Sequence, residues 1–391
     1  MEMMAATSLA VLCVCLILIV LWDAFEAFIL PRRVDRKFRL TRFYYVKSWG
    51  WLTAIARRIP SGRRRERILG YFGPLSLIGL LIMWGLVMIS AFATLQWSLG
   101  SRLAGPDKIV TFGSYLYMSG STFFTLGYGD VTPLDMLGRL ISIVEAGVGL
   151  GFLAIIIGYL PVVYGAFSRR EINISLLDAR AGSPPSSVEL LLRHGRDGDL
   201  KALQQLLNEW ERWSAELLES HLSYPVLTFF RSQHENQSWL TALTCILDVC
   251  SLCIVGFPGA PKWQAKMTFA MARHALVDLA QVLGTAPRPP EEDRLPPTDL
   301  ALSRHLFQEA GLVFTCSTEG ETRLHELRRM YEPYANAMCE RLFVVLPPWL
   351  HRQGAIDNWQ TSAWERNPEG FASNTTITRR KFDYVRQSYE D

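Results

Sequence analysis

The stretch Thr125-Leu126-Gly127-Tyr128-Gly129-Asp130 decides the fold of this chain. Its two glycines flank a tyrosine, and glycine adopts φ values that other residues resist, so the backbone can turn successive carbonyl groups to one side. Carbonyl oxygens arrayed in this way replace the water around a potassium ion when four such loops form a ring. A surface turn is the alternative, but the stretch lies between two apolar runs of membrane-spanning length, which favours the ion-binding interpretation.

The stretch resembles the selectivity filter of the potassium channels, with leucine at a position where valine is commoner. The resemblance covers about residues 68–170. It implies an all-α membrane protein whose tetrameric pore is built from two spans and a re-entrant pore loop. It also implies that K⁺ binds to the carbonyl groups of Thr125, Leu126, Gly127 and Tyr128, that Gly129 turns the chain outward, and that Asp130 lies at the outer mouth.

The hydropathy around the filter predicts the rest of a pore domain. Spans are expected at about residues 72–97 and 137–167, because each apolar run has at least the roughly 20 residues that a bilayer requires. A short re-entrant pore helix is expected at 112–124, capped by Thr111. The negative C-terminal end of that helix would point at the ion path and favour a cation.

Several residues near the filter are candidates for its support. Tyr117 and Met118 stand where the family often has two tryptophans, and Ser121 stands where it often has an acid. Glu145 is the only formally charged residue from Leu140 to Phe167, in the third span of the chain when an N-terminal helix is counted. An acid inside a membrane is a functional candidate, although it can also be a structural acid between helices. We hypothesise that Glu145 hydrogen-bonds the region of Ser121 or Thr122.

Three residues of the third span are candidates for a hinge or gate. Gly149 matches the glycine hinge that the resemblance implies, and close helix packing accounts equally well for a small residue. Pro161 lies about 18 Å further along the helix at 1.5 Å per residue. It could kink the helix and shape a gate with Gly158, or merely end the straight part of the helix.

The N-terminal 30 residues are predicted to form a retained transmembrane helix. Ala5–Trp22 carries no charge, and the first four residues lack the Lys or Arg of a signal peptide. Residues 31–67 form a strongly basic linker, which the positive-inside rule places in the cytoplasm, so the N-terminus is expected outside and the C-terminus inside. The linker is either a topology anchor only or also a binding site for anionic lipid headgroups, with Trp49 and Trp51 at the interface.

The remaining chain, residues 171–366, is predicted to form an α-helical cytoplasmic domain. Leucine and tryptophan recur at helical spacing from Leu200 to Leu217. The apolar run Asn236–Val255 could be mistaken for another span, but it contains Asp248 and is expected to be a buried soluble helix. Residues 367–391 are polar enough to be disordered.

The composition agrees with a membrane channel. The hydrophobic fraction is 49 % and mean hydropathy is +0.13, whereas the net charge of +3 gives no reason to expect nucleic-acid binding. No motif suggests catalysis or a cofactor other than K⁺ as the permeant ion. We therefore expect a homotetrameric, potassium-selective channel of the plasma or inner membrane, modulated by its cytoplasmic domain. The alternatives are a weakly selective cation channel and a non-conducting, membrane-tethered interaction protein.

Overall fold

The computed structural model describes residues 2–28, 30, 39–60, 62–105, 109–195, 200–232 and 236–351. The chain divides into two compact units. Unit 1 comprises Met1–Phe167 and His221–Phe230, and unit 2 comprises Ser168–Ser220 and Arg231–Asp391. The predicted tail at 367–391 lies outside the described residues.

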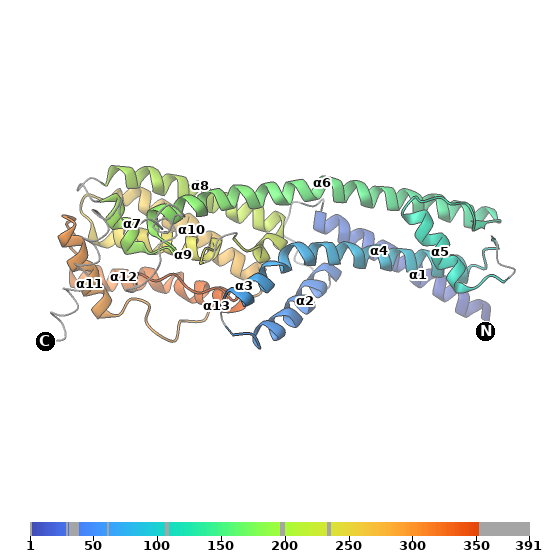
Figure 1. Cartoon of the computed structure of the whole chain (residues 1–391), viewed down its shortest axis with the longest axis horizontal. Helices are drawn as coiled ribbons and strands as arrows, with labels where there is room; N and C mark the ends of the chain where they lie inside the picture. Colours follow the sequence, from blue (N-terminus) through green and yellow to red (C-terminus); the bar gives the residue numbers. More distant parts are fainter. Residues whose placement is uncertain are drawn as a thin grey trace, which may run out of the picture. The chain divides into compact units, whose positions relative to one another are not determined.

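Unit 1 contains most of the apolar helices and the loop that decides the fold (Figure 1). Its elements are α1 (Glu2–Phe28), α2 (Leu40–Ala56), α3 (Arg63–Gly70), α4 (Phe72–Ser98), β1 (Leu103–Ala104), α5 (Phe112–Phe123), β2 (Thr132–Pro133), the 3₁₀ helix η1 (Pro225–Phe229) and the larger part of α6 (Met136–Ala181). The two short strands form one antiparallel pair, in which Leu103 is opposite Pro133.

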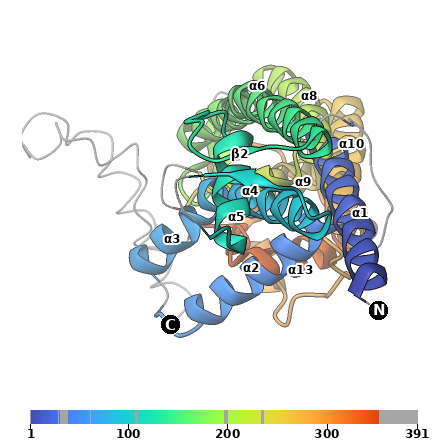
Figure 2. The ribbon, with the colours of Figure 1, turned by 90° about the vertical axis from the view of Figure 1, so that its right-hand side faces the viewer.

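The core of unit 1 forms where α1 and α5 pack on α4 (Figure 2). Small and branched side chains of α1 recur every three or four residues, which places them on one helix face. The core residues contributed by α1 are Ala10, Cys13, Ile17, Val20 and Ala24, and they meet Leu80, Trp84, Met88 and Phe92 of α4. Phe123, at the end of α5, joins the same core. The N-terminal helix is therefore an integral part of unit 1.

The predicted pore helices have the expected bounds. The helix expected at about 72–97 is α4, and the pore helix expected at 112–124 is α5. Thr111 begins α5 with a capping box, in which its own N–H donates to the Ser114 hydroxyl at 3.2 Å. Both helices begin and end within one residue of the prediction.

The third predicted helix is longer than the sequence suggested. The span was expected at 137–167, with Pro161 as a kink or an end, whereas α6 continues without a break to Ala181. The helix continues because Ile174 and Leu177 keep a buried face at helical spacing. It ends where Gly182 takes a φ of +80°.

The basic linker also contains helices that were not predicted. It was predicted as a linker over 31–67, but the structure forms α2 and α3 there, and residues 31–38 lie outside the described part. One face of α2 is buried through Trp49, Thr53 and Ala56, at the spacing i, i+4 and i+7. A buried stripe at helical spacing thus explains a helix in a segment that was predicted as a basic linker.

Among the described residues, four helices are long and apolar enough to cross a membrane: Met3–Phe28, Arg64–Ser98, Met136–Ala181 and Trp239–Gly256. They differ in how far the protein itself covers them. The most apolar window of the last helix is 89 % buried within the protein, whereas the other three windows are 22 %, 50 % and 11 % buried. The fourth helix therefore has the environment of a protein core, and the first and third expose apolar surface that a bilayer or a partner chain would have to cover.

Unit 2 is built around that buried helix. Its elements, with the end of α6, are α7 (Ser187–His194), α8 (Lys201–Ser223, the last three residues counted in unit 1), α9 (Trp239–Gly256), α10 (Lys262–Val282), α11 (Pro297–Glu309), α12 (Thr318–Arg329) and α13 (Glu332–Leu342). α7, α10, α12 and α13 all pack on α9. The predicted stripe of α8 is buried as expected from Leu203 to Leu217, whereas α7 and α11 were not predicted from the sequence.

Candidate functional site

The loop that follows α5 has an alternating backbone. Thr125, Gly127 and Gly129 have positive φ angles of 56°, 62° and 76°, and the intervening Leu126 and Tyr128 do not. An L residue with a side chain rarely adopts positive φ, so Thr125 is held there by its surroundings. Alternation of this kind points successive peptide groups to the same side, which is the arrangement that a row of cation-binding carbonyl groups requires.

The base of the loop is tied to the end of α5 through main-chain groups. The N–H of Leu126 donates to the Ser121 carbonyl at 2.8 Å, and the N–H of Thr125 donates to the Thr122 carbonyl at 3.0 Å. These bonds use carbonyls that would otherwise lack partners at a helix C-terminus. Ser121 and Thr122 were predicted as supports of the filter, and these hydrogen bonds to the loop run through their backbone.

The end of the loop at Asp130 is tied to α5 by a side chain. The Tyr117 hydroxyl donates to Asp130 Oδ2 at 2.8 Å, and the N–H of Val131 donates to Asp130 Oδ1 at 3.0 Å. Tyr117 was predicted as a filter support, and the structure brings it into contact with the predicted outer-mouth acid. The tyrosine thereby links the helix before the loop to the residue after it.

A second acid, Asp135, follows the loop and directly precedes α6, and it was not predicted from the sequence. Its carboxylate accepts the N–H of Arg102 and the N–H of Gly138, each at 2.8 Å. The bond from Gly138, at the start of α6, lowers the pKa of Asp135 below its usual value. One carboxylate thus joins the residue before β1 to the helix after the loop. The sequence signal was available, because an aspartate just before an apolar helix is a common N-cap.

Glu145 is buried behind α5, in the face of α6 that meets it. Its Oε1 accepts the Ser119 hydroxyl, which also contacts the Ile89 carbonyl of α4 at 2.8 Å, and within the described part of the chain no hydrogen-bond partner reaches its Oε2. We expected the region of Ser121 or Thr122 as partner, so that prediction was wrong by half a turn of helix. Ser119 is fully buried in the stripe of α5 that meets α6, whereas Ser121 and Thr122 are only half-buried.

Gly149 lies one turn after Glu145 and touches the same helix end. A Cβ atom on Gly149 would stand 1.9 Å from the carbonyl oxygen of Phe123 and 2.8 Å from its carbonyl carbon. Of the two interpretations of Gly149, the geometry favours close packing, because α6 stays helical through it. By contrast, a Cβ on Gly158 would meet nothing within 4 Å, and Pro161 lies exposed inside the continuous helix.

The loop is left uncovered by its own chain. Tyr128 is 69 % exposed and Leu126 is 56 % exposed, although both are large apolar or aromatic residues. Apolar side chains of α6 are exposed as well, among them Leu140, Ile143, Leu150 and Leu153. Apolar exposure on this scale is typical of a surface that lipid or another chain covers.

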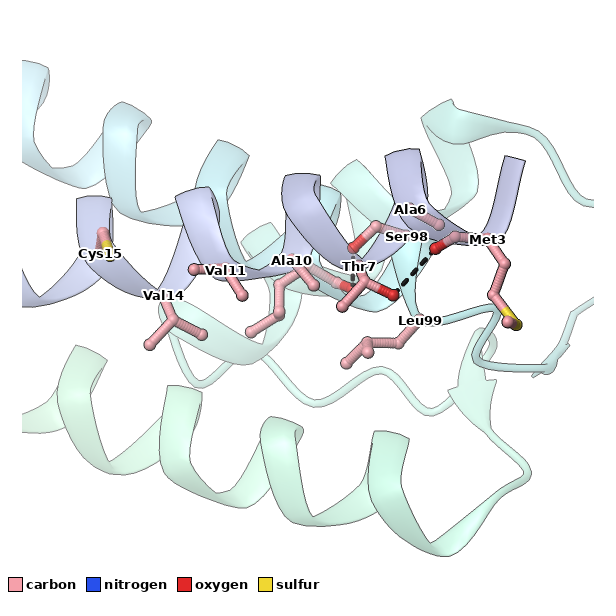
Figure 3. Close-up of a pocket in the computed structure, with 10 residues that line it drawn as sticks. Met3, Ala6, Thr7, Ala10, Val11, Val14, Cys15, Ser98 and Leu99 are labelled. Atoms are coloured by element: carbon pink, nitrogen blue, oxygen red, sulfur yellow. Dashed lines mark hydrogen bonds between the residues drawn. The ribbon is translucent and has the colours of Figure 1, made fainter. Parts of the chain in front are cut away.

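A groove lies in unit 1 between the first half of α1 and the end of α4 (Figure 3). Its lining residues are Met3, Ala6, Thr7, Ala10, Val11, Val14, Cys15, Leu95, Ser98 and Leu99. The hydroxyls of Thr7 and Ser98 donate to carbonyls of their own helices, at 2.8 and 2.9 Å. The groove therefore offers an apolar wall whose hydroxyl groups are already engaged within their helices.

Residues 81–164 match a family described as ion channel. The match covers most of α4, all of α5, the loop and α6 as far as Tyr164. It supports an ion-channel pore in this segment, built from the elements that hold Tyr117, Ser119 and Glu145 around the loop.

Two curated proteins are similar to the chain. An uncharacterised membrane protein of Bacillus subtilis (strain 168), YdjJ, is 24 % identical over 272 residues, which cover 66 % of this chain and 78 % of that protein. Protein LctB of Bacillus caldotenax is 36 % identical over 87 residues, 20 % of this chain and 64 % of LctB. No solved structure matches the chain. The apolar helices, the channel match and the membrane-protein relative together support a membrane protein.

Proposed function

We propose that the protein is a potassium-selective channel that conducts K⁺ passively across the membrane. The observation that carries the proposal is the alternating φ of the loop from Thr125 to Gly129. Carbonyl groups arrayed on one side of a loop replace the hydration shell of K⁺. The loop follows directly on the C-terminus of α5, whose helix dipole favours a cation at that end.

The functional protein in this proposal is a homotetramer. One loop supplies only one side of an ion path, and four loops around an axis are needed to surround a dehydrated ion. The exposure of Leu126 and Tyr128 supports this, because neighbouring subunits would cover them. The relevant test of assembly is the mass of the detergent-solubilised protein, for which we expect four times 44.3 kDa.

Selectivity is tested with the purified full chain in liposomes under opposed K⁺ and Na⁺ gradients. A reversal potential that follows K⁺ is the expected result. A potential between the two ion gradients would indicate a weakly selective cation channel, and absence of current would indicate a non-conducting interaction protein. Gly127→Ala should abolish K⁺ selectivity because residue 127 needs positive φ, and Gly147→Ala in α6, where φ is ordinary, is the matched control.

In the membrane we propose three spans, α1, α4 and the first part of α6. The N-terminus lies outside, and the basic segment and unit 2 lie in the cytoplasm. The charge of residues 31–67 supports this orientation. The burial of α9 within unit 2 supports its assignment to the cytoplasmic helical domain. Labelling of an introduced cysteine at Met3 by a membrane-impermeant reagent added outside intact cells would test the orientation of the first span.

Opening of the pore is modulated, in this proposal, through the segment Tyr224–Phe230, which follows α8. Phe230 packs so closely on α4 that a Cβ on Gly73 would stand 2.6 Å from its ring, and its ring lies 5.6 Å from that of Phe167 in α6. Val226 and Leu227 complete a buried cluster with residues of α4 and α6, the latter being Tyr159, Val163 and Ala166. The segment therefore contacts the stretch of α6 that surrounds Pro161.

The test of this modulation is Phe230→Ala, measured by single-channel recording in planar bilayers. Truncation of a buried phenylalanine costs about 3–5 kcal/mol of packing. The open probability should change strongly while the K⁺ reversal potential stays the same. Phe307→Ala, a fully buried phenylalanine of unit 2, is the control for general destabilisation. Equal open probabilities in the Phe230→Ala variant and the unmodified protein would contradict the role of the segment.

A further inference from the structure

The start of α2 is fixed in place by acids at the end of α1. Asp23 Oδ2 accepts the N–H of Thr41 at 2.9 Å and its hydroxyl at 2.6 Å. Arg39 Nε lies 3.4 Å from Glu26 Oε2 and 4.0 Å from Asp23 Oδ1, and both acids are buried. The carboxylates thereby stabilise the N-terminal end of α2, where the helix dipole favours negative charge. The orientation of α2 on unit 1 is set by these bonds.

The inner face of α2 is aromatic and packs on unit 1. Trp49 lies 4.8 Å from Phe72 and 4.9 Å from Phe229, measured between ring centroids, and Tyr45 stacks on Phe229 at 5.8 Å. Tyr44 reaches α4, where a Cβ on Gly79 would stand 2.3 Å from its hydroxyl oxygen. With this face occupied, the opposite face of α2 is turned away from the protein.

The outer face of α2 combines exposed aromatic and basic side chains. Trp51 is 71 % exposed and Phe43 is 63 % exposed, and Val46 lies between them. Lys47 is exposed on this face, with its ammonium group 5.6 Å from the Phe43 ring, and Arg42 is exposed in the first turn of the helix. The sequence contains no acidic residue from 39 to 65. The two acids of α1 that hold the start of α2 are turned inward and already engaged.

We propose that the outer face of α2 is a binding surface for anionic lipid headgroups at the membrane surface. Its cations complement lipid phosphates, and its exposed aromatic rings suit the zone between headgroups and acyl chains. An acidic protein surface could pair with the cations, but it would not bury Phe43, Val46 and Trp51. The acyl chains of a lipid would bury these side chains. The proposal concerns lipid binding and does not depend on whether the pore selects K⁺.

The proposal is tested by native mass spectrometry of the full chain in detergent, titrated with phosphatidylglycerol or with phosphatidylcholine. Phosphatidylglycerol should bind more tightly. Replacing two surface cations in Arg42→Gln/Lys47→Gln should weaken its binding about 30-fold, at about 1 kcal/mol for each cation. Lys266→Gln/Arg273→Gln removes one exposed lysine and one exposed arginine from α10 and should leave the affinity unchanged.

Each outcome of this titration decides for or against a lipid-binding surface. Equal phosphatidylglycerol affinity in the Arg42→Gln/Lys47→Gln variant and the unmodified chain would overturn the proposal, as would equal affinity for the two lipids. Trp51→Ala should weaken binding of both lipids by a similar factor, because it removes the apolar part of the surface. Full competition by glycerol phosphate, which has no acyl chain, would show a phosphate site and would also overturn the proposal. No ion gradient is present, so the result is independent of conduction.

Discussion

Gly149 of α6 and Phe123 at the end of α5 are in main-chain contact. The space between them is so small that a methyl group on Gly149 would lie 1.9 Å from the Phe123 carbonyl oxygen. Phe123 stands two residues before Thr125, where the alternating backbone begins. Position 149 therefore controls how closely α6 approaches the base of the loop.

Gly149→Ala is expected to destabilise the protein and to reduce K⁺ flux. Alanine is the better helix former by about 1 kcal/mol, but here its methyl group meets main-chain atoms that cannot rotate away. We expect a net loss of about 1–3 kcal/mol in the free energy of unfolding. Thermal unfolding in detergent and flux from liposomes measure the two effects. Gly147→Ala, where a Cβ meets nothing within 4 Å, should be neutral or slightly stabilising, and equal behaviour of the two variants would contradict the packing role.

Glu145→Gln is expected to change conduction or to speed the decay of current. The carboxyl group joins α6 to Ser119 of α5 and, through that hydroxyl, to the Ile89 carbonyl of α4. Ser119→Ala should have an effect of the same kind. The double variant should be no worse than the more severe single one, because each substitution removes the same hydrogen bond between Ser119 and Glu145. Additive effects on the decay rate, or unaltered currents in Glu145→Gln, would count against this role.

Tyr117→Phe removes a single hydroxyl group from the end of the loop at Asp130. Its bond to Asp130 is worth about 0.5–1.5 kcal/mol, so the fold should persist while the loop becomes less well held. We expect faster current decay or more Na⁺ permeation in bilayer recordings. Tyr71→Phe, which removes an exposed hydroxyl before α4, is the matched control. Identical recordings from the two variants would refute the linkage.

Arg294→Met is expected to destabilise unit 2. Arg294 donates to Asp248 at 2.7 Å and to Glu332 at 2.8 Å, and all three side chains are buried. Removing the cation leaves the buried Asp248 without its ion-pair partner, whereas Glu332 keeps Arg328, and breaking such a buried pair costs about 3–5 kcal/mol. Thermal unfolding at pH 8 measures the loss. Arg288→Met breaks an exposed pair with Glu340 and should cost no more than about 1 kcal/mol.

The loss in Arg294→Met should depend on pH. Burial raises the pKa of Asp248 to about 6 from its ordinary value of 3.8. A folded-state pKa above the unfolded one means that this group's contribution to stability falls as pH rises from about 4 to about 6 and is constant above. Without Arg294 the folded-state pKa rises further, so the variant should recover part of its stability at pH 5. A loss of equal size at pH 5 and pH 8 would contradict this linkage.

The bounds of α4 and α5 could be predicted from the sequence because their signals are local. The glycines of the loop, the cap at Thr111 and the charge-free run of α4 each act over a few residues, and the structure has α4 and α5 within one residue of the predicted bounds. The sequence also brought Tyr117 and Asp130 forward as candidates, and the structure joins them. Their hydrogen bond itself could not be read from the sequence.

Long-range partners were predicted less well. Glu145 was expected to bond the region of Ser121 or Thr122, and its partner is Ser119, because spacing along one helix does not say which face meets another. The segment Tyr224–Phe230 gave no signal at all. It is too short to predict an element, and its packing on Gly73 joins residues more than 150 positions apart in sequence. Pro161 suggested a kink or a helix end that the structure does not have. A proline inside an apolar helix can be accommodated when the surrounding helices pack against it.

The joint between Asp23 and Thr41 bears on how this protein is handled in the laboratory. Deleting the first thirty residues to simplify expression would remove Asp23 and Glu26, which hold the start of α2. It would also expose Trp84 and Met88 of α4, which pack against α1. The shortened chain would expose the apolar face of α4 that α1 covers, and α2, with its cations, would lose the bonds that fix its start. Affinity tags are better fused ahead of Met1 than substituted for the leading helix.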